Sequence, residues 1–170
     1  EEDAASTAIR LSAGEVARAR HLATMDDLLQ HVVRPLTVGS GSLADTLGGS
    51  RDATIFFSWS FRNRIDRFAD AFRAFLASHP GADVRCFAWI SVMCVDQHAS
   101  DFGSNPGIRW AREFEKFVQS IKHTVLLFSP WNDAEALKRT WCLWELYLTA
   151  AAGGKLSVQL PALEQEQMGR

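Results

Sequence analysis

The chain has 170 residues, of which 47% are hydrophobic and 22% are charged, and it carries a formal net charge of −2. This length and composition predict one folded domain with a sizeable core, and they argue against a fibrous chain or one without stable structure. A net charge so close to zero gives no electrostatic footprint for nucleic acid or for an anionic membrane.

The three cysteines, Cys86, Cys94 and Cys142, are an odd number in apolar surroundings. This pattern favours reduced, buried thiols over a disulfide framework, so we expect a cytoplasmic protein. No stretch approaches the roughly 20 apolar residues of a spanning helix, and the acidic start is not typical of a signal peptide. Any membrane anchor of a parent protein is therefore expected outside this chain.

Two helix starts are predicted near the N-terminus. Ser12 with Glu15, and Thr24 with Asp27, fit the reciprocal capping pattern in which two side chains satisfy backbone N–H groups at the start of a helix. Pro35 is expected to stop the second helix.

The segment 38–52 is rich in Gly and Ser and lacks periodicity, which predicts a flexible connector. We interpret residues 1–50 as an N-terminal helical extension with this connector, and residues 51–170 as the main domain.

Strands and helices alternate through the main domain. Buried strands are predicted at 53–58 and 123–129, and further strands at 82–90, with a prolongation to 95, and at 155–160. Between the strands, the spacing of apolar residues predicts amphipathic helices at 65–78 and 114–121, with a long loop at 96–109 before the second of them. A third helix is predicted at 139–152, where two glycines end it.

Such alternation predicts an α/β fold, with a parallel sheet of four to five strands covered by helices on both faces. Ligands gather at the carboxyl ends of the strands of such sheets. The default site is therefore a cleft built from the loops after Ser58, Ile90 and Ser129, together with the start of the helix that carries Glu145.

Three motifs occur in an order that resembles the Toll/interleukin-1 receptor (TIR) domain family. They are TIFFSWSFR, FEKFVQSIKHTVLLFSPW and RTWCLWEL. The resemblance covers about 53–160 and implies a flavodoxin-like, five-stranded parallel sheet. The chain departs from the family in two ways. Ser91 stands where many relatives have an acidic residue. No fifth strand is visible in the sequence, and truncation of a longer protein would explain its absence.

The resemblance also implies site residues. Some TIR domains cleave the nicotinamide glycosidic bond of NAD with a glutamate of the Trp-Cys-x-x-Glu helix, and Glu145 falls on that glutamate. Trp141 matches a residue that lines the nucleotide pocket. Ser58 ends the first strand, Trp59 matches the aromatic that follows it, and Arg62 lies near a basic position of relatives. NAD would be the substrate, and no cofactor is implied.

A single carboxylate is chemically sufficient for this reaction. Ordinary glycoside hydrolysis uses two carboxyl groups, because the leaving alkoxide must be protonated. Nicotinamide leaves a cationic pyridinium as a neutral molecule, so one carboxylate that binds the ribose and offsets positive charge at the anomeric carbon can supply the chemistry. Aromatic faces such as those of Trp59 and Trp141 would stack on the bases, at about 1 to 3 kcal/mol per base.

Other functions stay open at this point. The chain could be a non-enzymatic TIR module that assembles with copies of itself in signalling or innate immunity, for which Trp131, Trp141 and Trp144 offer an aromatic surface. It could also cleave another nucleoside or nucleotide N-glycoside. A purely structural Glu145 would pair with a nearby basic residue, namely Arg139, Lys138 or Lys155, or point to solvent.

Metal and thiol chemistry find little support. Cys94 and His98 lack the paired spacing of a zinc site, so no metal is expected. Cys142 falls on the cysteine of the family motif, where we expect a packed thiol rather than a nucleophile.

Overall fold

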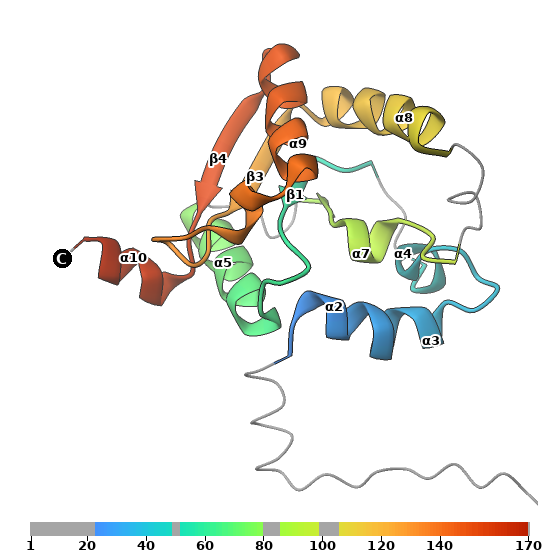
Figure 1. Ribbon diagram of the computed structural model, residues 1–170, viewed down its shortest axis with the longest axis horizontal. Helices are drawn as coiled ribbons and strands as arrows, with labels where there is room; N and C mark the ends of the chain where they lie inside the picture. The colour runs from blue at the N-terminus through green and yellow to red at the C-terminus, as the bar shows by residue number, and fades with distance from the viewer. Residues whose placement is uncertain (1–22, 49–51, 80–85, 99–105, 170) are drawn as a thin grey trace, which may run out of the picture.

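The computed structural model describes residues 23–48, 52–79, 86–98 and 106–169 (Figure 1). Its centre is an all-parallel sheet of four strands in the order β2-β1-β3-β4. The strands are β1 (Ile55–Ser58), β2 (Ala88–Trp89), β3 (His123–Leu127) and β4 (Lys155–Gln159). The predicted α/β class and parallel sheet are therefore confirmed.

Helices alternate with these strands along the chain. In order they are α2 (Met25–Leu28), the π-helical η1 (Leu29–Val33), α3 (Arg34–Leu36), α4 (Leu43–Thr46), α5 (Ile65–Ser78), α7 (Ser91–Cys94), α8 (Pro106–Ile121), the 3-10 helix η3 (Glu135–Lys138), α9 (Thr140–Ala151) and α10 (Ala162–Met168). None of the helices in the described residues is long and apolar enough to cross a membrane.

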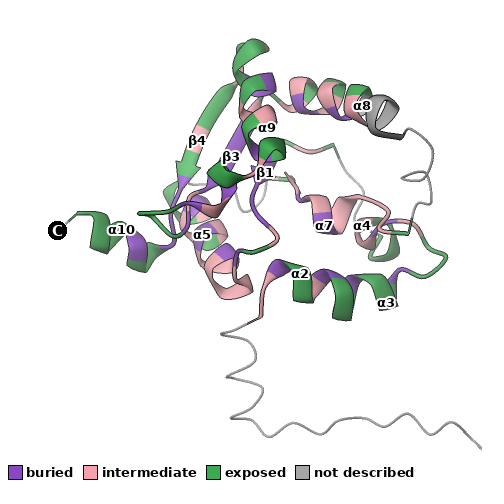
Figure 2. Cartoon of the chain, viewed as in Figure 1, coloured by how far each residue is buried: buried purple, intermediate pink, exposed green. Residues whose placement is uncertain are grey.

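Both faces of the sheet are covered, because successive side chains of a strand point to opposite faces. Phe57 and Leu127 belong to one core cluster with side chains of α2, η1 and α5. Phe56 packs with α8 and α9 on the other face, and Leu126 packs there with Cys142 of α9. In Figure 2, burial is concentrated along β1 and β3, whereas the edge strand β4 is largely exposed.

The strand order reverses between β1 and β3. From β1 the chain crosses to β2 on one side, and it then returns past β1 to β3 and β4 on the other side. The carboxyl ends of β1 and β3 are adjacent, with Ser58 in register with Leu126. Parallel α/β sheets bind their ligands at such a switch point.

The N-terminal helix differs from its prediction at Pro35. The Thr24–Asp27 capping box is confirmed, whereas the Ser12–Glu15 prediction lies outside the described residues. The helix does not stop before Pro35 but continues to Leu36. Proline lacks the N–H that an α-helix needs, and the π turn just before it gives the backbone another bonding pattern, in which Arg34 N donates to Leu29 O.

The segment expected to be a flexible connector contains a short helix. Ser42 and Asp45 form a second capping box at the start of α4. The preceding helix is also part of the main core, since Met25, Leu29 and Val33 are buried in the cluster that contains Phe57.

The second strand was predicted to be longer than it is in the described residues. In the described residues, β2 pairs only at Ala88 and Trp89, and its expected prolongation is the helix α7. The long loop is shorter than predicted because Pro106 opens α8, and proline is favoured at the first position of a helix. The short α10 was not predicted.

Candidate functional site

Glu145 lies at the switch point of the sheet. It comes from α9 and accepts a hydrogen bond at Oε2 from the Oγ of Ser58, the last residue of β1. Ser58 is buried, whereas Glu145 is half-buried. In the described part of the chain, Glu145 forms no ion pair, and its Oε1 accepts no hydrogen bond.

The environment of Glu145 favours a proton on its carboxyl group. Burial raises the pKa of Glu145 from 4.5 to about 7, against the lowering effects of the Ser58 hydrogen bond and of the Arg139 charge. A carboxyl with a pKa near 7 exchanges protons readily at neutral pH, and such shifts are common at catalytic sites.

The two tryptophans that sequence reasoning assigned to substrate lie in very different places. Trp59 is only 4% exposed and packs with Phe61 and Phe68, so it is part of the core as the structure stands. Trp141 is 43% exposed and lies one turn before Glu145 on α9, edge-on to Phe114 and Trp144. Of these two tryptophans, Trp141 is therefore the one with an accessible aromatic surface.

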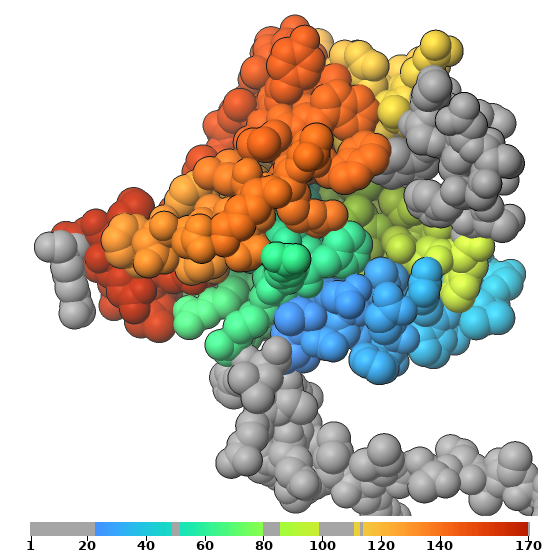
Figure 3. Space-filling model, viewed as in Figure 1, coloured from blue at the N-terminus to red at the C-terminus, as the bar shows by residue number. Residues whose placement is uncertain are grey.

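Figure 3 shows where this part of the molecule lies. The residues after β3 and those of α9, in orange, cover the front of the sheet, and the green segment after β1 emerges beneath them. The blue α2 and α3 lie directly below that segment. The site thus lies where the end of β1 meets α9.

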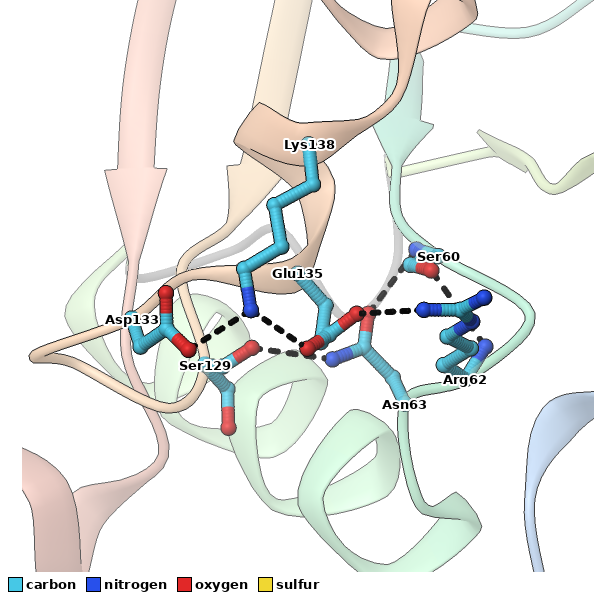
Figure 4. Close-up of polar contacts among 7 residues, drawn as sticks. All are labelled: Ser60, Arg62, Asn63, Ser129, Asp133, Glu135 and Lys138. Atoms are coloured by element: carbon cyan, nitrogen blue, oxygen red, sulfur yellow. Dashed lines mark hydrogen bonds and ion pairs between the residues drawn. The ribbon is translucent and has the colours of Figure 1, made fainter.

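Arg62 lies among charges that belong to the loop after β3 (Figure 4). Its side chain is 83% exposed, and its Nη1 is 4.0 Å from Glu135 Oε2. Lys138 pairs with the same glutamate at 2.8 Å and with Asp133 at 2.6 Å. The charged partner of Arg62 in the structure is therefore Glu135, and sequence reasoning did not anticipate this cluster.

Asn63 joins the ends of β1 and β3, and sequence reasoning missed it. Its Oδ1 accepts a hydrogen bond from Ser60 N at 2.8 Å, and its Nδ2 donates to Ser129 O at 3.0 Å (Figure 4). Serine and asparagine are both favoured in turns, and their occurrence at 60 and 63 could have pointed to a turn after β1.

A second serine and glutamate pair lies at the same edge of the sheet. Ser129 Oγ donates to Glu164 Oε1 at 2.7 Å. Glu164 is 6% exposed, and its buried Oε2 has no hydrogen-bond partner among the residues that the structure describes. A serine at the end of β1 and a serine two residues after β3 thus each bond a glutamate from a later helix.

A cavity of about 560 Å³ lies away from Glu145. It is lined by residues of α4, β2 and α7, among them Leu43, Trp89 and Met93, and Glu145 is not one of its lining residues. The cleft expected from the loops and the start of the α9 helix is therefore not this cavity.

The cysteines are all free thiols. Burial and the nearby Glu145 raise the pKa of Cys142 to about 11, so this thiol is neutral at physiological pH. Burial also raises the pKa of Cys86 and of Cys94. Within the described ranges, no three His, Cys, Asp or Glu side chains are grouped so that they could hold a metal ion.

Comparison of the chain with family models, with curated proteins and with solved structures found no match. The residues of the site are therefore the guide to its function.

Proposed function

We propose that this chain is a TIR-like domain that cleaves the nicotinamide glycosidic bond of NAD, with Glu145 as the catalytic residue. The observation that carries the proposal is the hydrogen bond between Ser58 and Glu145 at the switch point of a parallel sheet. The motif resemblance supports it independently, because it selects the same glutamate.

The free oxygen of Glu145 suits a sugar ligand. Ser58 holds Oε2 in place, which leaves Oε1 to accept hydrogen bonds from ribose hydroxyls. The exposed ring of Trp141 supplies a stacking surface one helical turn away. The cationic nicotinamide would favour the ionised carboxylate as it binds.

The chemistry needs no second acid. The bond between the anomeric carbon and the pyridinium nitrogen breaks, and its electron pair leaves with neutral nicotinamide. Ionised Glu145 offsets the positive charge that develops on the ribose. Water then adds its oxygen to the anomeric carbon and loses a proton to Glu145, whose pKa of about 7 suits a proton acceptor. The products are ADP-ribose, nicotinamide and one proton.

The test compares nicotinamide release from NAD by the wild type and by Glu145→Gln, at high protein concentration and with a crowding agent. We expect release by the wild type and a loss of at least about 100-fold in the variant, because its side chain carries no negative charge. Glu166→Gln changes an exposed helix glutamate and serves as the matched control. Equal release by wild type and E145Q, with both folded by circular dichroism, would contradict the proposal.

A second function, self-assembly, is favoured by the exposed edge of the sheet. In the described chain β4 pairs with β3 alone. Leu156 and Val158 are 45% and 59% exposed, and Lys155 is the only charged residue of the strand. Natural edge strands usually carry charges or bends that prevent pairing.

We infer that a second copy of this chain pairs with β4 in the antiparallel direction. A two-fold axis at Ser157 would place Leu156 of one copy opposite Val158 of the other and join the two sheets. Sedimentation should show concentration-dependent dimers of the wild type and monomers of Val158→Lys. Leu163→Lys, an equally apolar and exposed position on α10, is the control. A wild type that stays monomeric at high concentration would exclude this interface.

A further inference from the structure

Two side chains of α9, and that of Arg139 just before it, contact the end of β1 and the residue that follows. Glu145 bonds Ser58, Cys142 Sγ donates to Trp59 O at 3.3 Å, and Arg139 Nη1 donates to the same carbonyl at 3.4 Å. Residues three apart lie on neighbouring positions of one helix face. Arg139 and the first turns of α9 therefore hold Ser58, the last residue of β1, and Trp59, the residue after it.

Arg139 makes a further contact with this segment. Its guanidinium carbon lies 5.1 Å from the centre of the Phe61 ring, which is a cation–π distance. Arg139 also directly precedes the first residue of α9. Its backbone therefore begins the helix, while its side chain contacts the segment after β1. The guanidinium thus bridges the segment from Trp59 to Phe61.

We propose that Arg139 is a positioning residue for Glu145. It links the start of α9 to the residues that follow β1, next to the hydrogen bond between Ser58 and the Glu145 carboxyl. The catalytic part of this inference depends on the proposed NAD cleavage. Arg139 itself acts through Trp59 and Phe61 and through its charge.

The charges around Glu145 make the inference testable by pH. In the described residues, the groups that act on its carboxyl are Ser58 from β1 and Arg139, the residue before α9, and both lower its pKa. Cys142 faces it as a neutral thiol, because the pKa of Cys142 is about 11. Arg139 is therefore the positive charge that favours ionised Glu145.

The first experiment measures the pH profile of NAD cleavage by the wild type, Arg139→Gln and Arg139→Lys. Loss of the charge should raise the midpoint of the profile, because Arg139 lowers the pKa of Glu145. The rate of R139Q should therefore fall below that of the wild type at pH 7 and approach it near pH 9. R139K keeps the charge, so its midpoint should return toward that of the wild type. Arg73→Gln, an exposed arginine on α5, should leave the profile unchanged.

A second experiment does not need turnover. Proteins labelled at the glutamate carboxyl carbon are titrated by NMR, and the Glu145 signal is assigned by its absence in E145Q. A higher Glu145 midpoint in R139Q than in the wild type supports the positioning role, even if the wild type releases no nicotinamide and the proposed function fails. Identical midpoints in folded wild type and R139Q would overturn the inference, and R139K provides the comparison if R139Q does not fold.

Discussion

The hydroxyls of Thr124 and Thr149 lie 2.6 Å apart in the interior, between β3 and α9. Thr149 Oγ1 also lies 2.9 Å from the carbonyl oxygen of Glu145. Both threonines are fully buried. The helix that carries the candidate catalytic residue is therefore fastened to the centre of the sheet one turn after that residue.

Replacing either threonine by valine should destabilise the protein. Thr149→Val leaves the buried Thr124 hydroxyl without its partner and should lower the free energy of unfolding by about 1 to 3 kcal/mol. Thr124→Val should cost less, because the Thr149 hydroxyl still donates to the carbonyl oxygen of Glu145. The double variant should cost less than the sum of the two, because it leaves no unpaired hydroxyl. Urea unfolding gives the free energy of unfolding of all three variants. Strictly additive losses would argue against a hydrogen bond between the two threonines.

Glu145 should make stability depend on pH. The pKa of Glu145 in the folded protein is about 7, above its ordinary value of 4.5. The contribution of the protonated carboxyl to the free energy of unfolding is therefore fully present below pH 4.5 and is lost as the pH rises through 7. Glu145→Gln should then be more stable than the wild type at pH 8, by at most about 3 kcal/mol, and the advantage should disappear near pH 4.5. Unfolding curves across this range decide the point, and a constant difference between the proteins would contradict it.

Trp59 and Trp141 should respond differently to truncation. Trp59→Ala removes a core side chain and should cost about 3 to 5 kcal/mol of stability. Trp141→Ala should change stability far less but raise the KM for NAD, with a loss of about 1 to 3 kcal/mol if the ring stacks on the substrate. Thermal unfolding and steady-state kinetics separate the two effects. An unchanged KM in Trp141→Ala would remove this residue from the binding site.

Cys142 should resist alkylation in the folded protein. It is 1% exposed, and with a pKa of about 11 about one thiol in a thousand is ionised at pH 8. Cys86 and Cys94 are half-buried and should react first. Iodoacetamide treatment followed by peptide mass spectrometry measures the extent of alkylation at each cysteine. Rapid labelling of Cys142 without denaturant would show that the start of α9 opens readily.

The sequence predicted the elements whose periodicity is strong. β1, α5, β3, α9 and β4 were expected within a few residues of their bounds, because long apolar stripes and buried runs identify their own type of structure. The region after Trp89 was not, since the short apolar run from Val92 to Val95 has the same composition in a strand and in a helix. Only pairing with a neighbour distinguishes the two.

For the candidate site, sequence reasoning predicted Glu145 and Ser58, which the structure brings together, and Trp59, which lies in the core. Neighbouring residues of an extended chain point to opposite sides. Because Ser58 faces α9, Trp59 turns toward Phe68 of α5 and into the core. This alternation was available from the sequence. The position of Arg139 was not, because it depends on how a long side chain reaches across to another segment.

The backbone pairing at the start of α2 determines where the protein can be shortened. Met25 N donates to Asn63 O at 2.9 Å, Ile65 N donates to Ala23 O at 2.9 Å, and Thr24 forms an antiparallel bridge with Arg64. These residues brace the loop that leaves β1. A truncated protein that starts at residue 51 would lose this brace and would expose the apolar surface under Met25. Expression boundaries for biochemical work should therefore lie before Ala23, even though the recognisable motifs begin 30 residues later.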